Sequence, residues 1–334
     1  MEARLASVLP DDEGWQFEPK WDGFRCLAIK SGKSVELWGK SGKPLGRYFP
    51  EVLAMIEAVR YDHFVLDGEL IVPVDGVGSF DALQQRLHPA ESRIHKLSSA
   101  TPAMLIVFDL LQVEKVRWDD HPLRERRAAL ETFMPGVPPG NGLRLSPATV
   151  DRAVAERWFA RLSQELDGVI AKRLGDPYAS GERAMLKIKR IRTVDCVVGG
   201  FRYGTGSNQV GSLLLGLYNA EGKLDHVGFT SAFSKEEKPA LTKELEKLTG
   251  GPGFTGKAPG GPSRWSTERS SQWEPLRLEL VAEVRYDQIT GDRFRHGTGF
   301  VRWRPDKAPE TCTFDQLALP VDPDTIIKTI LATA

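Results

Sequence analysis

The stretch Glu18-Pro19-Lys20-Trp21-Asp22-Gly23-Phe24-Arg25 combines a lysine, a turn signal and the start of a strand. Pro19 restricts the residue before it to extended conformations, and Asp22-Gly23 is a turn-forming pair. The branched and aromatic residues of Phe24–Ile29 are typical of a strand. We therefore expect Lys20 on a loop at the rim of a sheet. Taken alone, such a lysine is most often a solvated surface residue.

The composition is that of a soluble globular protein with a full core. The chain has 334 residues, of which 41% are hydrophobic and 27% are charged. Basic and acidic residues number 45 each, which excludes a strongly basic DNA-coating protein and an acidic tail protein. No apolar run approaches the ~20 residues of a membrane-spanning helix. The three widely spaced cysteines predict neither a disulfide framework nor a zinc site, and we expect a cytoplasmic protein.

Two regions of different texture predict two domains in an α+β protein. The first alternates short strands with helices, the clearest helical pattern being Asp151–Leu166. From Val194 onward, five strand-like runs are interrupted by one helical pattern, Ser234–Leu248, with Ser234 and Glu237 as a capping box. Five strands with a helix between the third and the fourth suit a small closed barrel of OB type. We place the domains at 1–190 and 191–334.

Several other segments carry charged or aromatic side chains at strand spacing. Leu66–Leu70 places two carboxylates on one strand face, and Met185–Lys189 places two lysines on one face. Asp167–Lys172 begins with a carboxylate and ends with a lysine, and Phe108 comes near the end of an apolar run. Each segment alone is more often the solvated side of an amphipathic strand. Together with Lys20 they supply the groups of a nucleotidyl-transfer site.

The chemistry of such a site explains the residue types. A free lysine is protonated at neutral pH, and nearby positive charge favours loss of the proton that blocks nucleophilic attack. Lys187, Lys189 and a bound Mg²⁺ would supply that charge and stabilise the transferring phosphoryl group. Mg²⁺ needs only one or two carboxylates because it keeps several waters, so Glu69 and Asp167 are candidate ligands. In the second domain, Arg302, Arg304 and Lys307 fit a phosphate clamp.

These segments resemble the motifs of the covalent nucleotidyltransferase superfamily, which contains ATP-dependent DNA ligases, RNA ligases and mRNA capping enzymes. Glu18–Arg25 is similar to the first motif in its DNA-ligase form. The later motifs follow in the family's order at Leu66–Leu70, Phe108–Leu111, Asp167–Lys172, Lys187-x-Lys189 and Arg304-x-Asp306-Lys307. Their form is that of the short bacterial ligases called ligase C and of the ligase module of ligase D.

The resemblance implies an adenylation (nucleotidyltransferase) domain of antiparallel sheets with flanking helices, followed by an OB-fold β-barrel domain. It implies an ATP-dependent DNA ligase that seals 3′-OH/5′-phosphate nicks, with Lys20 as the catalytic residue that forms lysyl-AMP. ATP is the expected substrate and Mg²⁺ or Mn²⁺ the expected metal. The resemblance also implies a role for each site residue. Glu18 would contact adenine, Phe108 and Ile170 would stack on it, and Arg25 and Glu69 would contact ribose or phosphate. Lys187 and Lys189 would contact the α-phosphate, and Arg304, Asp306 and Lys307 would orient pyrophosphate.

Three positions depart from the family pattern. The fourth motif begins with Asp167 instead of glutamate, Lys40 stands where the family often has arginine, and Met185 replaces a tryptophan. Lys40 still supplies a cation for the nucleotide, although it lacks the two-pronged geometry of arginine. Because the first motif begins at residue 18, we expect no further DNA-binding domain before it. The expected setting is DNA repair by a nucleoid-associated monomer. The expected partners are nicked duplex DNA and, as a candidate, a repair primase-polymerase, with no membrane.

Two alternatives stay open at this point. An RNA ligase or capping-type nucleotidyltransferase shares the lysine chemistry, although Arg25 and the Arg304-x-Asp306-Lys307 ending favour a DNA ligase. A non-catalytic OB-type nucleic-acid-binding protein with a degenerate first domain would retain the fold without the reaction.

Overall fold

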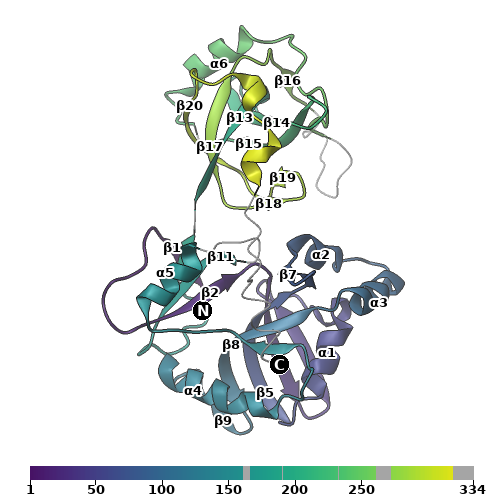
Figure 1. Ribbon diagram of the computed structural model, residues 1–334, viewed down its shortest axis with the longest axis vertical. Helices are drawn as coiled ribbons and strands as arrows, with labels where there is room; N and C mark the ends of the chain where they lie inside the picture. Colours follow the sequence, from purple (N-terminus) through teal and green to yellow (C-terminus); the bar gives the residue numbers. More distant parts are fainter. Residues whose placement is uncertain (161–165, 190, 232, 261–271, 319–334) are drawn as a thin grey trace. The chain divides into compact units, whose positions relative to one another are not determined.

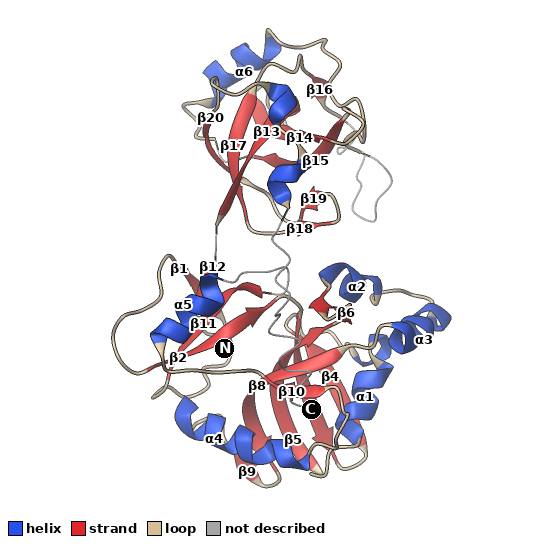
Figure 2. Cartoon of the chain, viewed as in Figure 1, coloured by secondary structure: helices blue, strands red, loops and turns tan. Residues whose placement is uncertain are grey.

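The computed structural model describes residues 1–160, 166–189, 191–231, 233–260 and 272–318 (Figure 1). Contacts divide the chain between Arg190 and Ile191 into two compact units. Strands dominate both units, and helices are few and short (Figure 2). Each unit has its own hydrophobic core, so each is described by itself below.

Two sheets form the framework of the first unit. The smaller sheet has the order β1-β12-β11-β2 and the larger has the order β10-β8-β5-β3-β4, with β9 paired to β8. The strands of the smaller sheet are β1 (Ala3–Ala6), β2 (Trp15–Trp21), β11 (Leu166–Arg173) and β12 (Met185–Lys189). Those of the larger sheet are β3 (Phe24–Ser31), β4 (Ser34–Gly39), β5 (His63–Ile71), β8 (Met104–Val113), β9 (Val116–Arg117) and β10 (Leu143–Leu145). A small hairpin joins β6 (Pro73–Val74) to β7 (Val77–Gly78).

The described residues of the first unit form five α-helices, and the sequence shows why three of them form. Pro50 occupies the first turn of α1, where its missing N–H costs nothing, and the Ser79 hydroxyl caps α2 by accepting from the Ala82 amide at 3.2 Å. The buried residues of α4 follow helical spacing, at Leu123, Arg126, Leu130 and Phe133. The helices are α1 (Pro50–Glu57), α2 (Phe80–Gln85), α3 (Glu91–Ala100), α4 (Leu123–Phe133) and α5 (Arg152–Ala160).

The helix expected over Asp151–Leu166 does not include Leu166, which is the first residue of a strand. The structure has α5 over Arg152–Ala160 and begins β11 at Leu166, and residues 161–165 lie outside the described part of the chain. Leu166 continues the apolar helical spacing, but its side chain packs beside Trp21 and Ile71 as the first residue of a strand. Tertiary packing therefore overrides the local pattern at this end.

A six-stranded sheet with the order β15-β14-β13-β17-β20 forms the second unit, with β16 paired to β13. The capping box predicted at Ser234 and Glu237 is present, since each side chain accepts a hydrogen bond from the other residue's amide just before α6. The elements are β13 (Arg192–Tyr203), β14 (Val210–Tyr218), β15 (Leu224–Thr230), α6 (Lys238–Glu246), β16 (Glu274–Pro275), β17 (Val281–Tyr286), β18 (Ile289–Thr290), β19 (Arg293–Phe294) and β20 (Gly299–Trp303).

The closed barrel expected from the sequence is not formed by the strands described in 191–231, 233–260 and 272–318. The two edge strands meet only at an isolated bridge between Thr230 and Thr298. The segment between β17 and β20 forms a separate hairpin of β18 and β19. The bridge to β15 therefore forms only at the residue before β20 begins. The unit therefore has the strand order of an OB-type fold, with a ladder that stops short of closure.

Among the described residues, no helix is long and apolar enough to cross a membrane. The cysteines Cys26, Cys196 and Cys312 are all free and buried. Burial raises the pKa of the Cys26 thiol to about 12 and that of Cys312 to about 11. All three thiols are therefore kept neutral and away from solvent.

Candidate active site

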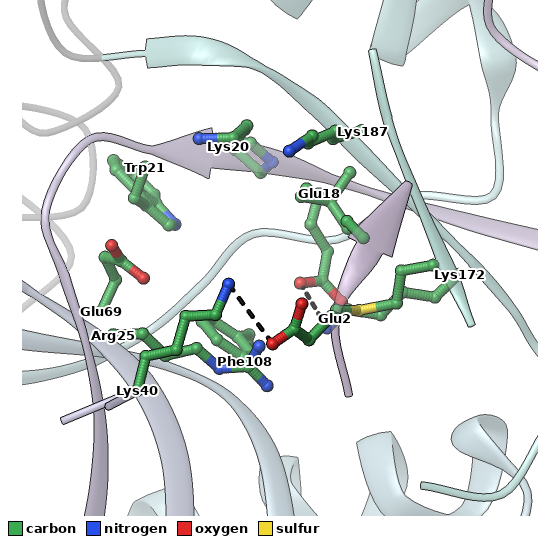
Figure 3. A pocket seen from close by; sticks show the side chains of 14 residues that line it. Glu2, Glu18, Lys20, Trp21, Arg25, Lys40, Glu69, Phe108, Lys172 and Lys187 are labelled. Carbon is green, nitrogen blue, oxygen red and sulfur yellow. Dashed lines mark hydrogen bonds and ion pairs between the residues drawn. The ribbon is translucent and has the colours of Figure 1, made fainter. Parts of the chain in front are cut away.

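A pocket in the first unit brings together side chains from its two sheets (Figure 3). Glu18, Lys20, Ile170 and Lys187 come from the smaller sheet, whereas Arg25, Glu69 and Phe108 come from the larger one. Lys40, just after β4, also lines the pocket. Eight of the predicted site residues thus line this pocket. Asp167 and Lys189 lie beside it, because Asp167 contacts both Lys20 and Lys189.

Lys20 lies on a strand, and the expectation of a loop is wrong. β2 is the edge strand of its sheet. Its outer side meets Thr149 at an isolated bridge through Phe17 instead of pairing with a further strand, so a proline such as Pro19 can be accommodated there. Lys20 is opposite Gly168 of β11, and Gly168 is opposite Lys189 of β12. The period of two residues then places Glu18 with Lys20, and Lys187 with Lys189, on one face of the sheet.

Two β-bulges place site residues. On β11 the pairing with β2 jumps from Leu166 to Gly168, so Asp167 is the extra residue. On β8 the pairing with β5 jumps from Asp109 to Val107, so Phe108 is the extra residue. A bulge re-aims the side chain that it carries and is common beside active sites. Both residues therefore owe their position to irregular pairing.

Asp167 joins two of the lysines through one oxygen. Its Oδ2 lies 2.5 Å from Nζ of Lys20 and 2.8 Å from Nζ of Lys189. Burial opposes ionisation of Asp167, but the two ammonium groups outweigh it and lower the pKa of the carboxyl. Burial and the charges of Lys189, Lys20 and Lys40 lower the pKa of Lys187. Lys20, Lys187 and Lys189 therefore form a cationic cluster in which Lys20 and Lys189 share the Asp167 carboxylate.

Glu69, on β5 of the larger sheet, lines the same pocket as Lys20 (Figure 3). Burial raises the pKa of Glu69 to about 8, against the opposing attraction of Lys20 and Arg25. Among the described residues, no cluster of three His, Cys, Asp or Glu side chains is present that could hold a metal by itself. Glu69 and Asp167 nevertheless fit Mg²⁺, because this ion takes one or two carboxylates and completes its shell with water and substrate phosphates.

Glu18 is held from two sides in the wall of the pocket. Nζ of Lys172 donates to its Oε2 at 2.8 Å and Nε2 of Gln16 donates to its Oε1 at 2.7 Å. Lys172 also lies 4.5 Å from the centre of the Phe108 ring, within cation–π range. The sequence analysis assigned no role to Lys172 or Gln16, although both lie two residues from a predicted site residue on the same strand face.

Arg25 is anchored by a two-pronged contact with Asp67. Nε and Nη2 of the guanidinium donate to Oδ1 and Oδ2 at 3.0 and 2.5 Å, and the Tyr178 hydroxyl donates to Oδ2 at 2.8 Å. Nη1 of Arg25 also donates to the Met1 carbonyl. Tyr178, which the sequence did not single out, lies in an irregular segment that carries no motif signal. Arg25 thus reaches the pocket from a fixed position.

Lys40, Glu2 and the first residue of β1, Ala3, also line the pocket. Nζ of Lys40 lies 3.4 Å from a Glu2 carboxylate oxygen, drawn as a dashed line in Figure 3. Glu2 and Ala3 line the pocket because β1 runs parallel to β12 with Ala3 opposite Met185. No sequence motif marks Glu2 or Ala3.

Three predicted residues of the second unit form a cluster of their own. Arg304 Nε donates to the Asp306 carboxylate at 3.0 and 3.2 Å, while Nη1 of Arg304 and Nζ of Lys307 both contact Asp195. The hydrogen bond from Arg304 lowers the pKa of Asp306 to about 2. Arg302, expected beside them, is exposed and contacts Glu283 at 2.6 Å instead. Asp195 is a further residue that the sequence analysis missed.

Comparison with known proteins identifies the family. Residues 5–189 match the model of an ATP dependent DNA ligase domain, and residues 206–307 match that of an ATP dependent DNA ligase C terminal region. The chain belongs to the ATP-dependent DNA ligases. This ligase is 42% identical over 337 residues to DNA ligase C of Mycobacterium tuberculosis, covering 96% of this chain and 94% of that protein.

Two further relatives place the ligase within its family. It is 31% identical over 309 residues to the multifunctional non-homologous end joining DNA repair protein LigD of Mycobacterium tuberculosis, covering 88% of this chain and 37% of that protein. A solved structure of a Lig E DNA ligase has a TM-score of 0.57 at 15% identity, covering 91% of this chain and 99% of that one, and shows the shared fold.

The expected fold class, a nucleotidyltransferase domain followed by an OB-type ligase domain, is confirmed apart from barrel closure. The chain is an enzyme that uses ATP as substrate together with a divalent metal such as Mg²⁺, and it acts on nicked DNA. Membership of this family removes the alternative of a non-catalytic binding protein.

Proposed function

We propose that this ligase seals 3′-OH/5′-phosphate nicks in duplex DNA through a lysyl-AMP intermediate at Lys20. The observation that carries the proposal is the position of Lys20, which lines the pocket and lies 2.5 Å from Asp167, with Lys187 also in the pocket wall. These contacts give one lysine a fixed position among groups suited to a triphosphate. Lys20 is the nucleophile.

In the first step, the Lys20 Nζ lone pair attacks the α-phosphorus of ATP. The N–P bond forms, the bond from that phosphorus to the bridging oxygen breaks, and pyrophosphate leaves with the electron pair. An ammonium carries no lone pair, so the Lys20 nitrogen loses one proton before attack and a second as the N–P bond forms. The charges of Lys187 and Lys189 stabilise the negative charge that develops on the phosphoryl oxygens.

The remaining steps return the lysine to its free form. A nick 5′-phosphate oxygen attacks the lysyl-AMP phosphorus, which breaks the N–P bond and makes a DNA-adenylate. The nick 3′-hydroxyl then attacks the 5′-phosphate, loses its proton and expels AMP. One ATP is consumed for each phosphodiester bond.

The other pocket residues bind and orient the nucleotide. Glu18, fixed by Lys172 and Gln16, contacts adenine, and Phe108 and Ile170 stack on its two faces. Arg25, Lys40 and Glu69 contact ribose or phosphate, and Lys187 and Lys189 contact the α-phosphate. Glu69 and Asp167 would hold Mg²⁺ or Mn²⁺, which neutralises phosphate charge when bound. Residues 1–190 act as the adenylation domain. In residues 191–334, the OB-fold domain, Arg304, Asp306 and Lys307 orient pyrophosphate.

The biological setting that we propose is DNA repair. The similarity to an end joining DNA repair protein supports it. The ligase would act as a monomer in the cytoplasm, associated with the nucleoid, and would receive nicks left by a repair primase-polymerase. The free buried cysteines suit this reducing compartment.

Covalent labelling tests the chemistry at Lys20. With ATP labelled at the α-phosphate and Mg²⁺, the wild type should acquire label that survives base and is released by acid. Lys20→Ala should acquire none, whereas the exposed-lysine control Lys33→Ala should match the wild type. Label of wild-type intensity on folded Lys20→Ala would refute the assignment. Sealing of an all-RNA nick as fast as an all-DNA nick would instead favour the RNA-ligase alternative.

A further inference from the structure

Asp195 holds together two cations that come from the same loop of the second unit. Its Oδ1 and Oδ2 lie 2.9 and 3.0 Å from Nη1 of Arg304, and Oδ2 also lies 2.7 Å from Nζ of Lys307. Both cations thus contact a single carboxylate oxygen. The Asp195 side chain is only 10% exposed, so little solvent reaches this contact.

Asp195 has a fixed backbone. It lies on β13, opposite Glu283 of β17. The side chain of Gln316, which lies outside the sheet, makes two hydrogen bonds with the Asp195 backbone. The Gln316 side chain donates to the Asp195 carbonyl at 3.1 Å and accepts from the Asp195 amide at 3.2 Å. The carboxylate is therefore presented by a central strand, whereas the cations that it contacts follow β20.

The cluster has a second carboxylate with a different position. Asp306 is 60% exposed and contacts Arg304 through Nε and Nη2, so it holds only one of the two cations. Asp195 alone among these described carboxylates bridges Arg304 and Lys307. Without it the two like charges would repel and separate, because each lies on a long flexible side chain.

We propose that Asp195 is a positioning residue for nucleotide activation: it keeps Arg304 and Lys307 together as one dication for the leaving pyrophosphate. This inference rests on the function proposed above for Arg304 and Lys307. A diphosphate leaving group carries charge on both phosphates, so two cations held at a fixed spacing bind it better than two that move independently. Asp195 itself touches neither nucleotide nor metal.

The position predicts an effect on one step of the reaction only. Asp195→Asn keeps the size of the side chain and removes its charge, so we expect lysyl-AMP formation to slow about tenfold, as for loss of a charged hydrogen bond. The ATP concentration for half-maximal rate should rise less than the maximal rate falls. Sealing of a pre-adenylated nick, which releases no pyrophosphate, should stay within twofold of wild type.

The experiment measures single-turnover adenylation and single-turnover sealing of a pre-adenylated nick, using full-length enzyme freed of AMP by pyrophosphate. Asp195→Glu, which keeps the charge, should recover part of the adenylation rate. The exposed Asp292→Asn in the same unit is the matched control, and urea denaturation checks folding of every variant. An equal loss in both reactions would indicate a merely structural role and overturn the proposal.

Arg304→Ala separates this inference from the proposed function. If Arg304→Ala slows adenylation and Asp195→Asn does not, the assignment of Asp195 fails while the proposed function stands. If Arg304→Ala leaves adenylation unchanged, the pyrophosphate role of the cluster fails and the inference fails with it. Lys20→Ala, tested separately by labelling, reports on the nucleophile and not on this cluster.

Discussion

Replacement of Lys172 by methionine should destabilise the first unit strongly. Lys172 and Glu18 are each about 3% exposed and their charged atoms are 2.8 Å apart. Methionine fills similar space but removes the cation, which leaves Glu18 with Gln16 as the partner of one carboxylate oxygen. Breaking a buried ion pair by removing one partner costs about 3–5 kcal/mol, a large part of the ~5–15 kcal/mol that stabilises a typical protein.

Urea denaturation of the intact chain measures this cost as the change in free energy of unfolding. The double variant Glu18→Gln/Lys172→Met removes both charges, so it should recover most of the stability lost in Lys172→Met. Lys223→Met, which breaks an exposed pair with Glu221, is the matched control and should cost less than about 1 kcal/mol. The reasoning is refuted if Lys172→Met costs no more than the control, or if the double variant is as unstable as the single one.

Two further substitutions test the fold around other buried groups. Gly168→Ala should lower the free energy of unfolding, measured with urea, by more than about 2 kcal/mol. The reason is that Gly168 has a φ of +149° and a Cβ there would lie 2.0 Å from the Ile188 carbonyl oxygen. Wild-type stability of this variant would contradict the prediction. Burial and the charges of Arg293 and Arg202 lower the pKa of His226 to about 3. As the pH falls below 6.5, His226 therefore binds a proton in the unfolded chain before it does so in the folded chain. The free energy of unfolding should therefore decrease by up to about 1.4 kcal/mol for each pH unit by which the pH is lowered in this window. In urea titrations at pH 7, 6 and 5, His226→Leu should make this pH dependence weaker. An unchanged slope would exclude His226 as its source.

The sequence predicts the regular parts of this fold well because they follow local rules. Ser79 caps α2 and Ser234 pairs with Glu237 as expected. Strand spacing also predicted Lys187 and Lys189 on one face of a strand, which is β12 in the structure. These features depend on neighbours within a few residues, so they can be read without knowing the fold.

The parts that sequence could not predict depend on contacts between distant strands. The bulges at Asp167 and Phe108 arise from pairing with β2 and β5, and no local pattern marks an extra residue. Lys20 is in a strand because β2 pairs with β11, although Pro19 and Asp22-Gly23 favour a loop locally. The prediction of a closed barrel was wrong for the same reason, because closure requires β20 to pair with β15, which is distant along the chain.

Residues that contact the predicted site residues received no role from the motifs, although Lys172 ends one of them. Lys172 and Gln16 contact Glu18, Tyr178 contacts Asp67, and Asp195 contacts Arg304. Lys172, Tyr178 and Asp195 are each more than 100 residues from these partners, whereas Gln16 lies two residues from Glu18 on the same strand. Such residues become visible only when hydrogen-bond partners are known.

The seclusion of the three native thiols makes this ligase convenient for fluorescence spectroscopy. Cys26, Cys196 and Cys312 are each 0% exposed, so maleimide dyes should leave them unmodified under native conditions. One engineered surface cysteine in each unit would then accept a donor and an acceptor dye without prior removal of the native ones. Energy transfer between the dyes would report, molecule by molecule, how the separation of the units changes through the catalytic cycle.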